Sequence, residues 1–243
     1  MAKKNSVMMF IDTSKCMGCK ACQVACKQWH SLPTEPTEFT GLYTNPPDVS
    51  GSTLTIVKFT EYVDMRGKLN WLMSRIQCMH CNQAECQIHC PKGVQKSLEG
   101  FVVFNDKCTV ANLRGLDLAP GATPAQKIAR YIELCPYNIP RFSGDPVTGT
   151  GRFVKCDFCV NRFGGACAPG CKDGKATTAC EFTCPVGAIV TDKAKTIMAM
   201  AKERLFEVKV NLGYNMATLY GGRGRVLYLL TDEYGAYGLP YPD

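Results

Sequence analysis

Cysteine spacing constrains this chain more than any other feature of the sequence. The first run reads Cys16-x2-Cys19-x2-Cys22-x3-Cys26, within a total of 16 cysteines in 243 residues. Three thiolates at positions i, i+3 and i+6 can wrap one cubane iron–sulfur cluster, and the fourth cysteine of such a run ligates a different cluster. Runs of this kind belong in pairs that exchange their last cysteine, so the spacing predicts a chain of clusters that conducts electrons.

Three further runs follow, and each departs from the regular spacing. The second run is Cys78-x2-Cys81-x4-Cys86-x3-Cys90-Pro91. The third keeps only its ends, Cys108 and Cys135, because residues 109–134 contain no cysteine. The fourth begins as Cys156-x2-Cys159, continues through a glycine-rich insertion and ends as Cys180-x3-Cys184-Pro185.

The repeated runs predict an α+β fold built from tandem bacterial-ferredoxin-like units of the two-cluster [4Fe-4S] type, with β-hairpin insertions and a C-terminal helix. We assign residues 1–30 together with 145–195 to a unit that holds two clusters, and residues 78–144 to a second unit that holds one. Residues 31–77 would form an irregular insertion with a hairpin. Residues 196–243 would supply the C-terminal helix and a tail that contacts a partner.

Local patterns predict the individual elements. Thr123-Pro124 is a good helix start, because threonine can accept the first free amide bonds and proline fits the first helical position. Asp192 is a plausible cap for a helix over 192–208 that has Ile197, Met200, Ala201, Leu205 and Val208 on one face. The expected strands are 7–12, 53–63, 69–76 and 225–230, and a helix over 124–134 would deliver Cys135.

Composition narrows the functional classes. The formal net charge of +7 counts every thiol as neutral. A cubane with a 2+ core and four thiolates contributes a charge of −2, so three of them would leave the loaded protein at about +1. The basic excess then compensates clusters and does not predict nucleic-acid binding. We expect no membrane span either, because the longest apolar stretch near the C-terminus, residues 226–230, is far shorter than the roughly 20 residues a span needs.

Two other uses of many cysteines fit less well. An extracellular disulfide framework would explain the even number of cysteines but not the repeated spacings. Structural zinc uses Cys-x2-Cys pairs but not a triple run at i, i+3 and i+6. No paired acid, catalytic triad or open metal site stands out in the sequence, so we predict no catalytic residue on this chain.

Several short segments carry a resemblance to one family. They are Ala25-Cys-Lys-Gln-Trp29, Asn45-Pro-Pro-Asp48, Cys135-Pro-Tyr-Asn-Ile-Pro140, Lys155-Cys-Asp-Phe-Cys159 and Ala179-Cys-Glu-Phe-Thr-Cys-Pro185. Through them the chain resembles the iron–sulfur (beta) subunit of molybdenum- or tungsten-dependent formate dehydrogenases, from about residue 8 to about residue 230. The cysteine runs alone would also fit the iron–sulfur subunits of polysulfide and dimethyl sulfoxide reductases, or a free polyferredoxin, and these stay as alternatives.

The resemblance implies three [4Fe-4S] clusters and assigns their ligands. Cluster A would be held by Cys16, Cys19, Cys22 and Cys184. Cluster B would be held by Cys26, Cys156, Cys159 and Cys180. Cluster C would be held by Cys78, Cys81, Cys86 and Cys135. The same resemblance puts cluster A nearest a catalytic subunit and cluster C at the exit.

The implied function is electron transfer without catalysis on this chain. Single electrons would pass between the pterin–Mo/W subunit of a formate dehydrogenase or CO2 reductase and a soluble carrier such as a multihaem cytochrome c. Membrane-bound members have four clusters and a C-terminal anchor helix, whereas this chain lacks the middle cysteines of the third run and the anchor. It therefore resembles the soluble three-cluster type, which implies export to the periplasm with a twin-arginine-bearing partner; the cytoplasm is the alternative.

Two groups of residues keep open interpretations. Four cysteines lie outside the twelve ligands: Cys90, Cys108, Cys167 and Cys171. They could be free thiols, disulfides such as Cys90–Cys108, or ligands of an extra metal. Five lysines lie beside cysteines and could raise a cluster's potential, although a solvated lysine is the ordinary case: Lys15, Lys20, Lys27, Lys107 and Lys155.

Overall fold

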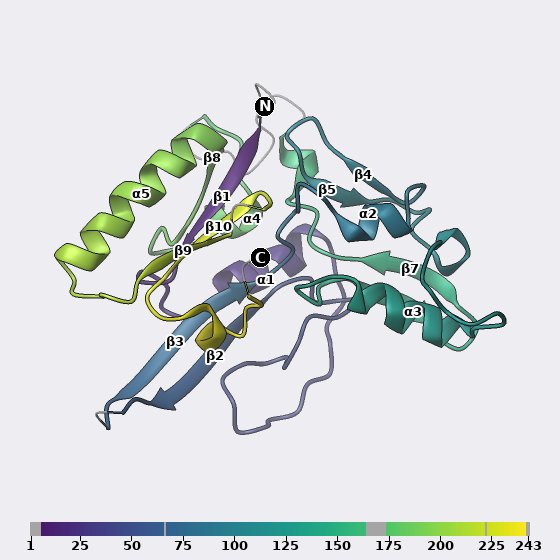
Figure 1. Ribbon diagram of the computed structural model, residues 1–243, viewed down its shortest axis with the longest axis horizontal. Helices are drawn as coiled ribbons and strands as arrows, with labels where there is room; N and C mark the ends of the chain where they lie inside the picture. The colour runs from purple at the N-terminus through teal and green to yellow at the C-terminus, as the bar shows by residue number, and fades with distance from the viewer. Residues whose placement is uncertain (1–5, 66, 164–173, 222, 242–243) are drawn as a thin grey trace.

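The protein is described here by a computed structural model that covers residues 6–65, 67–163, 174–221 and 223–241. One four-stranded sheet forms the centre of the part of the fold that contains both ends of the chain (Figure 1). Its strand order is β8 (Ile189–Lys193), β1 (Val7–Asp12), β10 (Val226–Leu230) and β9 (Thr218–Gly221). β1 pairs antiparallel with β8 and parallel with β10, so residues from both ends of the sequence form its centre.

Both faces of this sheet are buried, which explains why β1 and β10 read as continuous apolar runs. Helix α5 (Ala194–Val210) covers one face, where Ile197, Ala201 and Val208 pack against Met8, Phe10, Leu227 and Leu229. The other face turns Met9, Ile11 and Tyr228 toward the main core, which also contains Cys22 and Cys180. This face of the sheet therefore packs against the region that contains Cys22 and Cys180.

The C-terminal helix is confirmed, but its predicted start is wrong. Helix α5 begins at Ala194 after Lys193, and no side chain caps it. Asp192 lies inside β8, where it pairs with Met8 of β1, and its carboxylate is bonded to Lys175. Strand β10 is entirely buried, so residues 226–230 belong to the core of the sheet and not to an exposed tail. The division of the chain into separate units stays a prediction.

Three hairpins extend from the fold. β2 (Ile56–Val63) pairs with β3 (Leu69–Ile76) in the register Ile56 to Ile76, close to the predicted strands 53–63 and 69–76. The second hairpin joins β4 (Val94–Lys96) to β5 (Val102–Phe104), and the third joins β6 (Arg141–Asp145) to β7 (Thr150–Val154). Figure 1 shows the β2–β3 arm projecting away from the main sheet.

The second core lies under helix α3 (Pro124–Glu133). Thr123 accepts a hydrogen bond from the amide of Gln126, and the Gln126 side chain accepts one from the amide of Thr123, so a capping box starts this helix where the sequence predicts it. Ile128 and Tyr131 then pack on Phe153 of β7. The remaining helices and turns are short: α1 (Ala21–Trp29), α2 (Glu85–His89), α4 (Ala179–Phe182), η1 (Val110–Asn112), η2 (Val160–Arg162) and η3 (Tyr234–Tyr237).

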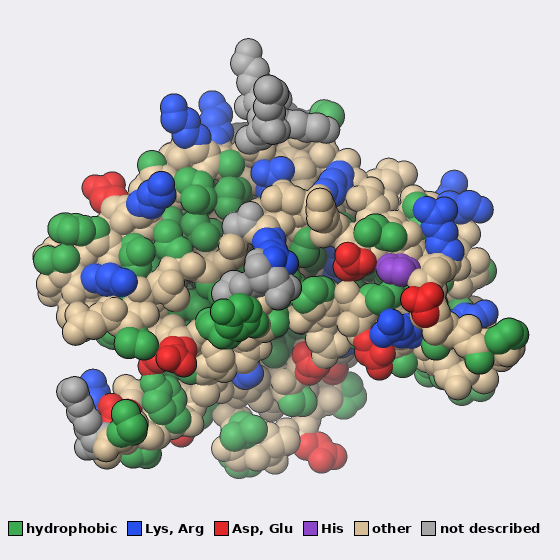
Figure 2. All heavy atoms as spheres, in the orientation of Figure 1, with side chains coloured by type: hydrophobic (Ala, Val, Ile, Leu, Met, Phe, Trp, Pro, Cys, Tyr) green, Lys and Arg blue, Asp and Glu red, His purple; other side chains and the backbone are tan. Residues whose placement is uncertain are grey.

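No helix within the described residues is long and apolar enough to cross a membrane. On the face drawn in Figure 2, Lys and Arg side chains are interspersed with Asp, Glu and apolar side chains. That face therefore presents no uniform basic field of the kind nucleic-acid binding would use.

Candidate metal centres

The first set of thiols, quartet A, comprises Cys16, Cys19, Cys22 and Cys184. Cys16 and Cys19 lie on the loop from β1 into α1, Cys22 lies in the first turn of α1, and all four line one cavity. Burial raises the pKa of Cys22 to about 12, and the charges of Cys180, Cys16 and Cys184 add to the rise while Arg75 opposes it. Gly18 turns this loop with φ of 66°, and a Cβ on it would come within 2.6 Å of the Phe59 ring. Any other residue at this turn would have to displace the Phe59 ring and the Met73 side chain of the β2–β3 arm.

Quartet B comprises Cys26, Cys156, Cys159 and Cys180. Cys26 lies on α1, Cys180 on α4, and the other two on the turn that follows β7. Burial raises the pKa of the Cys26 thiol, and the neighbouring charges of Cys156, Cys159 and Cys180 raise it further. The thiols of quartet B therefore lie close enough to repel one another as thiolates, which is the arrangement a shared cation core would relieve.

Helices α1 and α4 each connect quartet A to quartet B, because each carries one cysteine of either quartet at or near its ends. Cys22 and Cys26 lie on α1 four residues apart, and Cys180 and Cys184 lie four residues apart on and just after α4. At 1.5 Å rise per residue, four residues separate such positions by about 6 Å along a helix. Because α1 and α4 contact each other, each helical segment presents one thiol to each quartet. This is the exchange that the ferredoxin-like spacing predicts.

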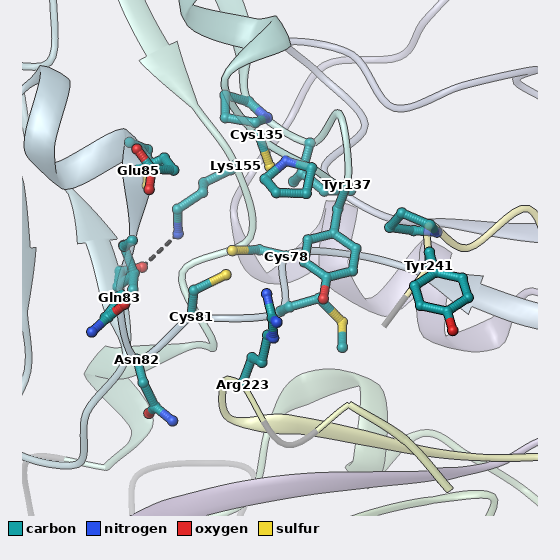
Figure 3. Close-up of a pocket in the computed structure, with 18 residues that line it drawn as sticks. Cys78, Cys81, Asn82, Gln83, Glu85, Cys135, Tyr137, Lys155, Arg223 and Tyr241 are labelled. Atoms are coloured by element: carbon teal, nitrogen blue, oxygen red, sulfur yellow. Dashed lines mark hydrogen bonds between the residues drawn. The ribbon is translucent and has the colours of Figure 1, made fainter. Parts of the chain in front are cut away.

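Quartet C comprises Cys78, Cys81, Cys86 and Cys135, which line a cavity of about 610 Å³. Figure 3 shows the thiols of Cys78, Cys81 and Cys135 pointing into this cavity from three directions. Burial raises the pKa of Cys86 to about 12; Lys155 opposes that rise, and the charges of Cys78, Cys135 and Cys81 add to it. Helix α3 delivers Cys135, because the amide of Cys135 donates to the carbonyl of Ile132 at the helix end.

The donor sets fit [4Fe-4S] clusters in composition, since each quartet offers four cysteine sulfurs and eleven of the twelve cysteines are buried or half-buried. A thiol must lose its proton to ligate, and the raised pKa values mean that a bound metal core would have to supply the compensating charge. The structure thus groups the twelve predicted residues into the three expected sets. Their assignment as ligands stays a prediction.

Three cations are buried among the described residues, Arg75, Lys155 and Arg162, and the first two line cavities of the quartets. Arg75 of β3 is 3% exposed and lines the quartet A cavity, while Lys155 is 6% exposed and lines the quartet C cavity. Neither forms a salt bridge with a carboxylate within the described residues. Among the five lysines beside cysteines, Lys155 alone is buried. Arg75 could not be predicted from the sequence, because no local pattern indicates that an arginine on a hairpin strand faces thiols.

Cys90 and Cys108 lie together in the second core, outside all three quartets. Both are 0% exposed, and their side chains contact each other as free thiols. Tyr131 links them to quartet C, since its hydroxyl lies 3.6 Å from the Cys108 sulfur and donates to the Cys86 carbonyl at 2.8 Å. Within the described residues, no group of three or more potential metal ligands includes either cysteine. Cys167 and Cys171 lie outside the described residues.

The histidines near the cysteine runs are engaged in packing or ion pairs. His80 is fully buried, its Nδ1 accepts from the Val102 amide at 3.1 Å, and burial lowers its pKa so that it stays neutral. His30 Nε2 lies 3.2 Å from Asp157 Oδ1, and that oxygen also accepts from the Cys159 amide at 2.7 Å. His30, Asp157 and Cys159 bring their ligand atoms together, but this group includes a quartet B thiol and so belongs to that centre.

Comparisons with known proteins define the class first. A 4Fe-4S binding domain matches residues 7–28, and a 4Fe-4S dicluster domain matches residues 69–183. The chain is therefore an iron–sulfur protein of tandem ferredoxin-like domains, and the predicted α+β fold of such units with a C-terminal helix is confirmed.

Relatives then identify the family. The chain is 33% identical over 246 residues to the iron–sulfur subunit of the nitrate-inducible formate dehydrogenase of Escherichia coli, covering 98% of this chain and 73% of that protein. It is 33% identical over 200 residues to the formate dehydrogenase subunit beta of Megalodesulfovibrio gigas, covering 82% of each protein. It is 34% identical over 224 residues to the formate dehydrogenase 2 subunit beta (cytochrome c-553) of Nitratidesulfovibrio vulgaris, covering 92% of each. This protein belongs to the family of formate dehydrogenase iron–sulfur subunits, which are electron-transfer subunits.

Proposed function

We propose that this chain is the non-catalytic electron-transfer subunit of a formate dehydrogenase or CO2 reductase. It would relay single electrons through three [4Fe-4S] clusters between a catalytic subunit that carries a pterin-bound molybdenum or tungsten and an external carrier such as a cytochrome c. The observation that carries the proposal is the gathering of twelve cysteines into three thiol quartets that adjoin one another. The relative from Nitratidesulfovibrio vulgaris, named for cytochrome c-553, supports the kind of carrier.

When bound, the clusters would supply the one-electron redox chemistry. The polypeptide would hold them through Cys16, Cys19, Cys22 and Cys184, through Cys26, Cys156, Cys159 and Cys180, and through Cys78, Cys81, Cys86 and Cys135. Contacts between the quartets support an order of the sites. Cys22 and Cys180 lie at the boundary of quartets A and B, and the charge of Cys78 in quartet C acts on Cys156 in quartet B. Quartet B would therefore be the middle station.

Apolar side chains are exposed at the quartet A end of this row. Cys19 of quartet A is exposed, and its sequence neighbours Met17 and Val24 are more than half exposed. Exposed apolar side chains grouped around a redox site are typical of a protein interface. We assign this end to the catalytic subunit, and we assign the quartet C end to the exchange of electrons with the carrier.

We also propose that the complex works in the periplasm after export with a twin-arginine-bearing partner. A second candidate function is the iron–sulfur subunit of another molybdopterin oxidoreductase. The sequence is 28% identical over 178 residues to a subunit of the anaerobic dimethyl sulfoxide reductase of Haemophilus influenzae, covering 71% of each protein. Identity and coverage are both lower than for the formate dehydrogenase subunits, which favours the first candidate.

The test is to purify the chain with its partner without air, to measure iron and acid-labile sulfide, and to add formate. About 12 iron atoms on this chain, after the partner's own iron is subtracted, and reduction of the clusters by formate are the expected results. About 16 iron atoms would mean that Cys90, Cys108, Cys167 and Cys171 hold a fourth cluster. Twelve iron atoms without reduction by formate would favour the second candidate, and a monomer from the native source would favour a free polyferredoxin.

A further inference from the structure

Two buried cations lie between the thiol quartets and form no salt bridge with a carboxylate in the described part of the chain. Burying a charged group without a counter-charge costs several kcal/mol in principle, so such a group is normally paired. The charges that act on Arg75 are those of cysteine sulfurs, and those that act on Lys155 are cysteine sulfurs followed by the carboxylate of Asp157. The arrangement of the two cations relative to the three quartets therefore carries information about how those quartets are tuned.

Arg75 lies between quartets A and B. It lines the quartet A cavity together with Cys22, and its Nη1 donates to the side-chain oxygen of Gln77, which lies 4.0 Å from the sulfur of Cys156 in quartet B. Its position is held by neutral groups: Nε donates to Thr55 Oγ1 at 3.3 Å, and the Arg75 carbonyl accepts from the buried Tyr228 hydroxyl at 2.7 Å. Burial works to lower the pKa of Arg75, but the charges of Cys180, Cys22, Cys156 and Cys26 outweigh it and raise that pKa.

Lys155 occupies the corresponding place between quartets B and C. It lines the quartet C cavity, and Figure 3 shows its side chain passing beside the thiols of Cys78 and Cys81, with the ammonium turned to a backbone carbonyl. The same nitrogen donates to the carbonyl of Cys156, a quartet B residue, at 2.9 Å and to the carbonyl of Val102 at 2.5 Å. It also lies 4.8 Å from the centre of the Phe104 ring. Neutral acceptors thus fix the ammonium, and the thiols of two quartets supply its counter-charge together with the carboxylate of Asp157.

We infer that Arg75 and Lys155 are shared positioning cations that raise the reduction potentials of the clusters in overlapping pairs, Arg75 acting on A and B and Lys155 on B and C. This inference rests on the proposed function, because it presumes the three clusters. A fixed positive charge stabilises the more negative, reduced form of a cluster and so raises its potential, and it does so strongly where water does not screen it. The middle site, quartet B, faces both cations.

The test is a potentiometric titration followed by electron paramagnetic resonance on the complex with its catalytic partner. Arg75→Gln should lower the reduction potentials of clusters A and B and leave that of cluster C unchanged. Lys155→Gln should lower the reduction potentials of clusters B and C and leave that of cluster A unchanged. Each fall should change the oxidised-to-reduced ratio at a fixed ambient potential at least tenfold, which is 59 mV for one electron. The double variant should lower B more than either single variant does.

Matched controls separate charge from structure. The charge-keeping variants Arg75→Lys and Lys155→Arg should stay near the wild-type potentials. Lys15→Gln removes an exposed cation one residue before Cys16 and should leave all three potentials unchanged, because solvent and salt screen it. If Arg75→Gln fails to assemble, Gln77→Glu places a carboxylate against the guanidinium and should lower A and B in the same way.

The outcomes distinguish this inference from the function on which it rests. Wild-type protein with fewer or more than three cluster signals would overturn the proposed function. Three intact clusters whose potentials do not move in the Gln variants, or move equally at all three sites, would overturn the role of the cations and leave the proposed function standing. Potentials that fall in the charge-keeping variants as much as in the Gln variants would show that packing and not charge is responsible.

Discussion

Cys135→Ala tests the grouping of the thiols most directly, because Cys135 belongs to quartet C alone. Cys135 interacts electrostatically with three other thiols, those of Cys78, Cys81 and Cys86. Quartets A and B are joined by α1 and α4, whereas quartet C shares no helix with them. Alanine offers no atom that could replace the sulfur. The variant should therefore lose one cubane of four iron atoms and keep two, so iron per chain falls from about 12 to about 8.

The assays are iron and sulfide per chain and electron paramagnetic resonance of the complex reduced by formate. Signals from clusters A and B should remain reducible, while electron delivery to an external carrier falls at least tenfold because the exit station is gone. Cys90→Ala is the matched control, since it removes a fully buried thiol four residues after Cys86 at the end of the same helical segment but outside the quartets. It should keep about 12 iron atoms and lower the free energy of unfolding by about 1–3 kcal/mol through lost packing.

Two results would refute this grouping. If Cys135→Ala keeps all its iron, Cys135 is not a ligand and another donor completes quartet C. If it loses iron from all three sites while circular dichroism shows the fold intact, the quartets are not independent. Loss of four iron atoms in Cys90→Ala would instead show that the second core holds metal.

Two further predictions concern the scaffold of quartet A. Gly18→Ala should lose the cluster A signal, because the new Cβ would meet Phe59 at 2.6 Å and the backbone φ there is 66°. The control Gly41→Ala has a φ of 78° and nothing within 4 Å of its Cβ, so it should keep all iron and lower the free energy of unfolding by about 1–2 kcal/mol. Equal iron in both variants would contradict the packing argument. Asp12→Ala should lower the free energy of unfolding by about 3 kcal/mol in urea titrations, since Asp12 is 1% exposed and pairs with Arg204 at 2.8 Å. Glu207→Ala removes the exposed partner of the same arginine and should cost less than about 1 kcal/mol; similar costs for the two would show that Asp12 is not the buried anchor.

Elements with strong local signals were predictable from the sequence. The capping box of α3 and the alternating strands of the β2–β3 arm lie within a few residues of their expected bounds, because threonine–proline chemistry and two-residue periodicity act over short distances. The start of α5 was not predictable in the same way. Asp192 has the composition of a helix cap, but its pairing with Met8 of β1 keeps it in a strand. A contact between residues 184 positions apart in the sequence overrides the local preference.

The electrostatics of the site show the same limit more sharply. Five lysines lie beside cysteines in the sequence, and burial alone separates Lys155 from the others. Arg75 lies three residues before Cys78 in the sequence and yet faces quartets A and B, because β3 carries it past the main sheet before the polypeptide reaches quartet C. Sequence spacing reports which thiols can share a metal, whereas the charge around the metal depends on which distant strands the fold brings past it.

The second core explains how the fold can bury Cys90 and Cys108 side by side as free thiols. By the family resemblance these two cysteines stand where a fourth cluster would have two ligands, and the missing middle ligands correspond to residues 109–134. Helix α3 forms in that segment and turns Ile128 and Tyr131 inward, where they pack with Phe153 around the two thiols. The Tyr131 hydroxyl then bonds the carbonyl of Cys86, so the packing that occupies this region also holds a ligand loop of quartet C. Apolar burial and a part-buried hydrogen bond therefore hold this region together, and we expect the position of quartet C to depend on that packing.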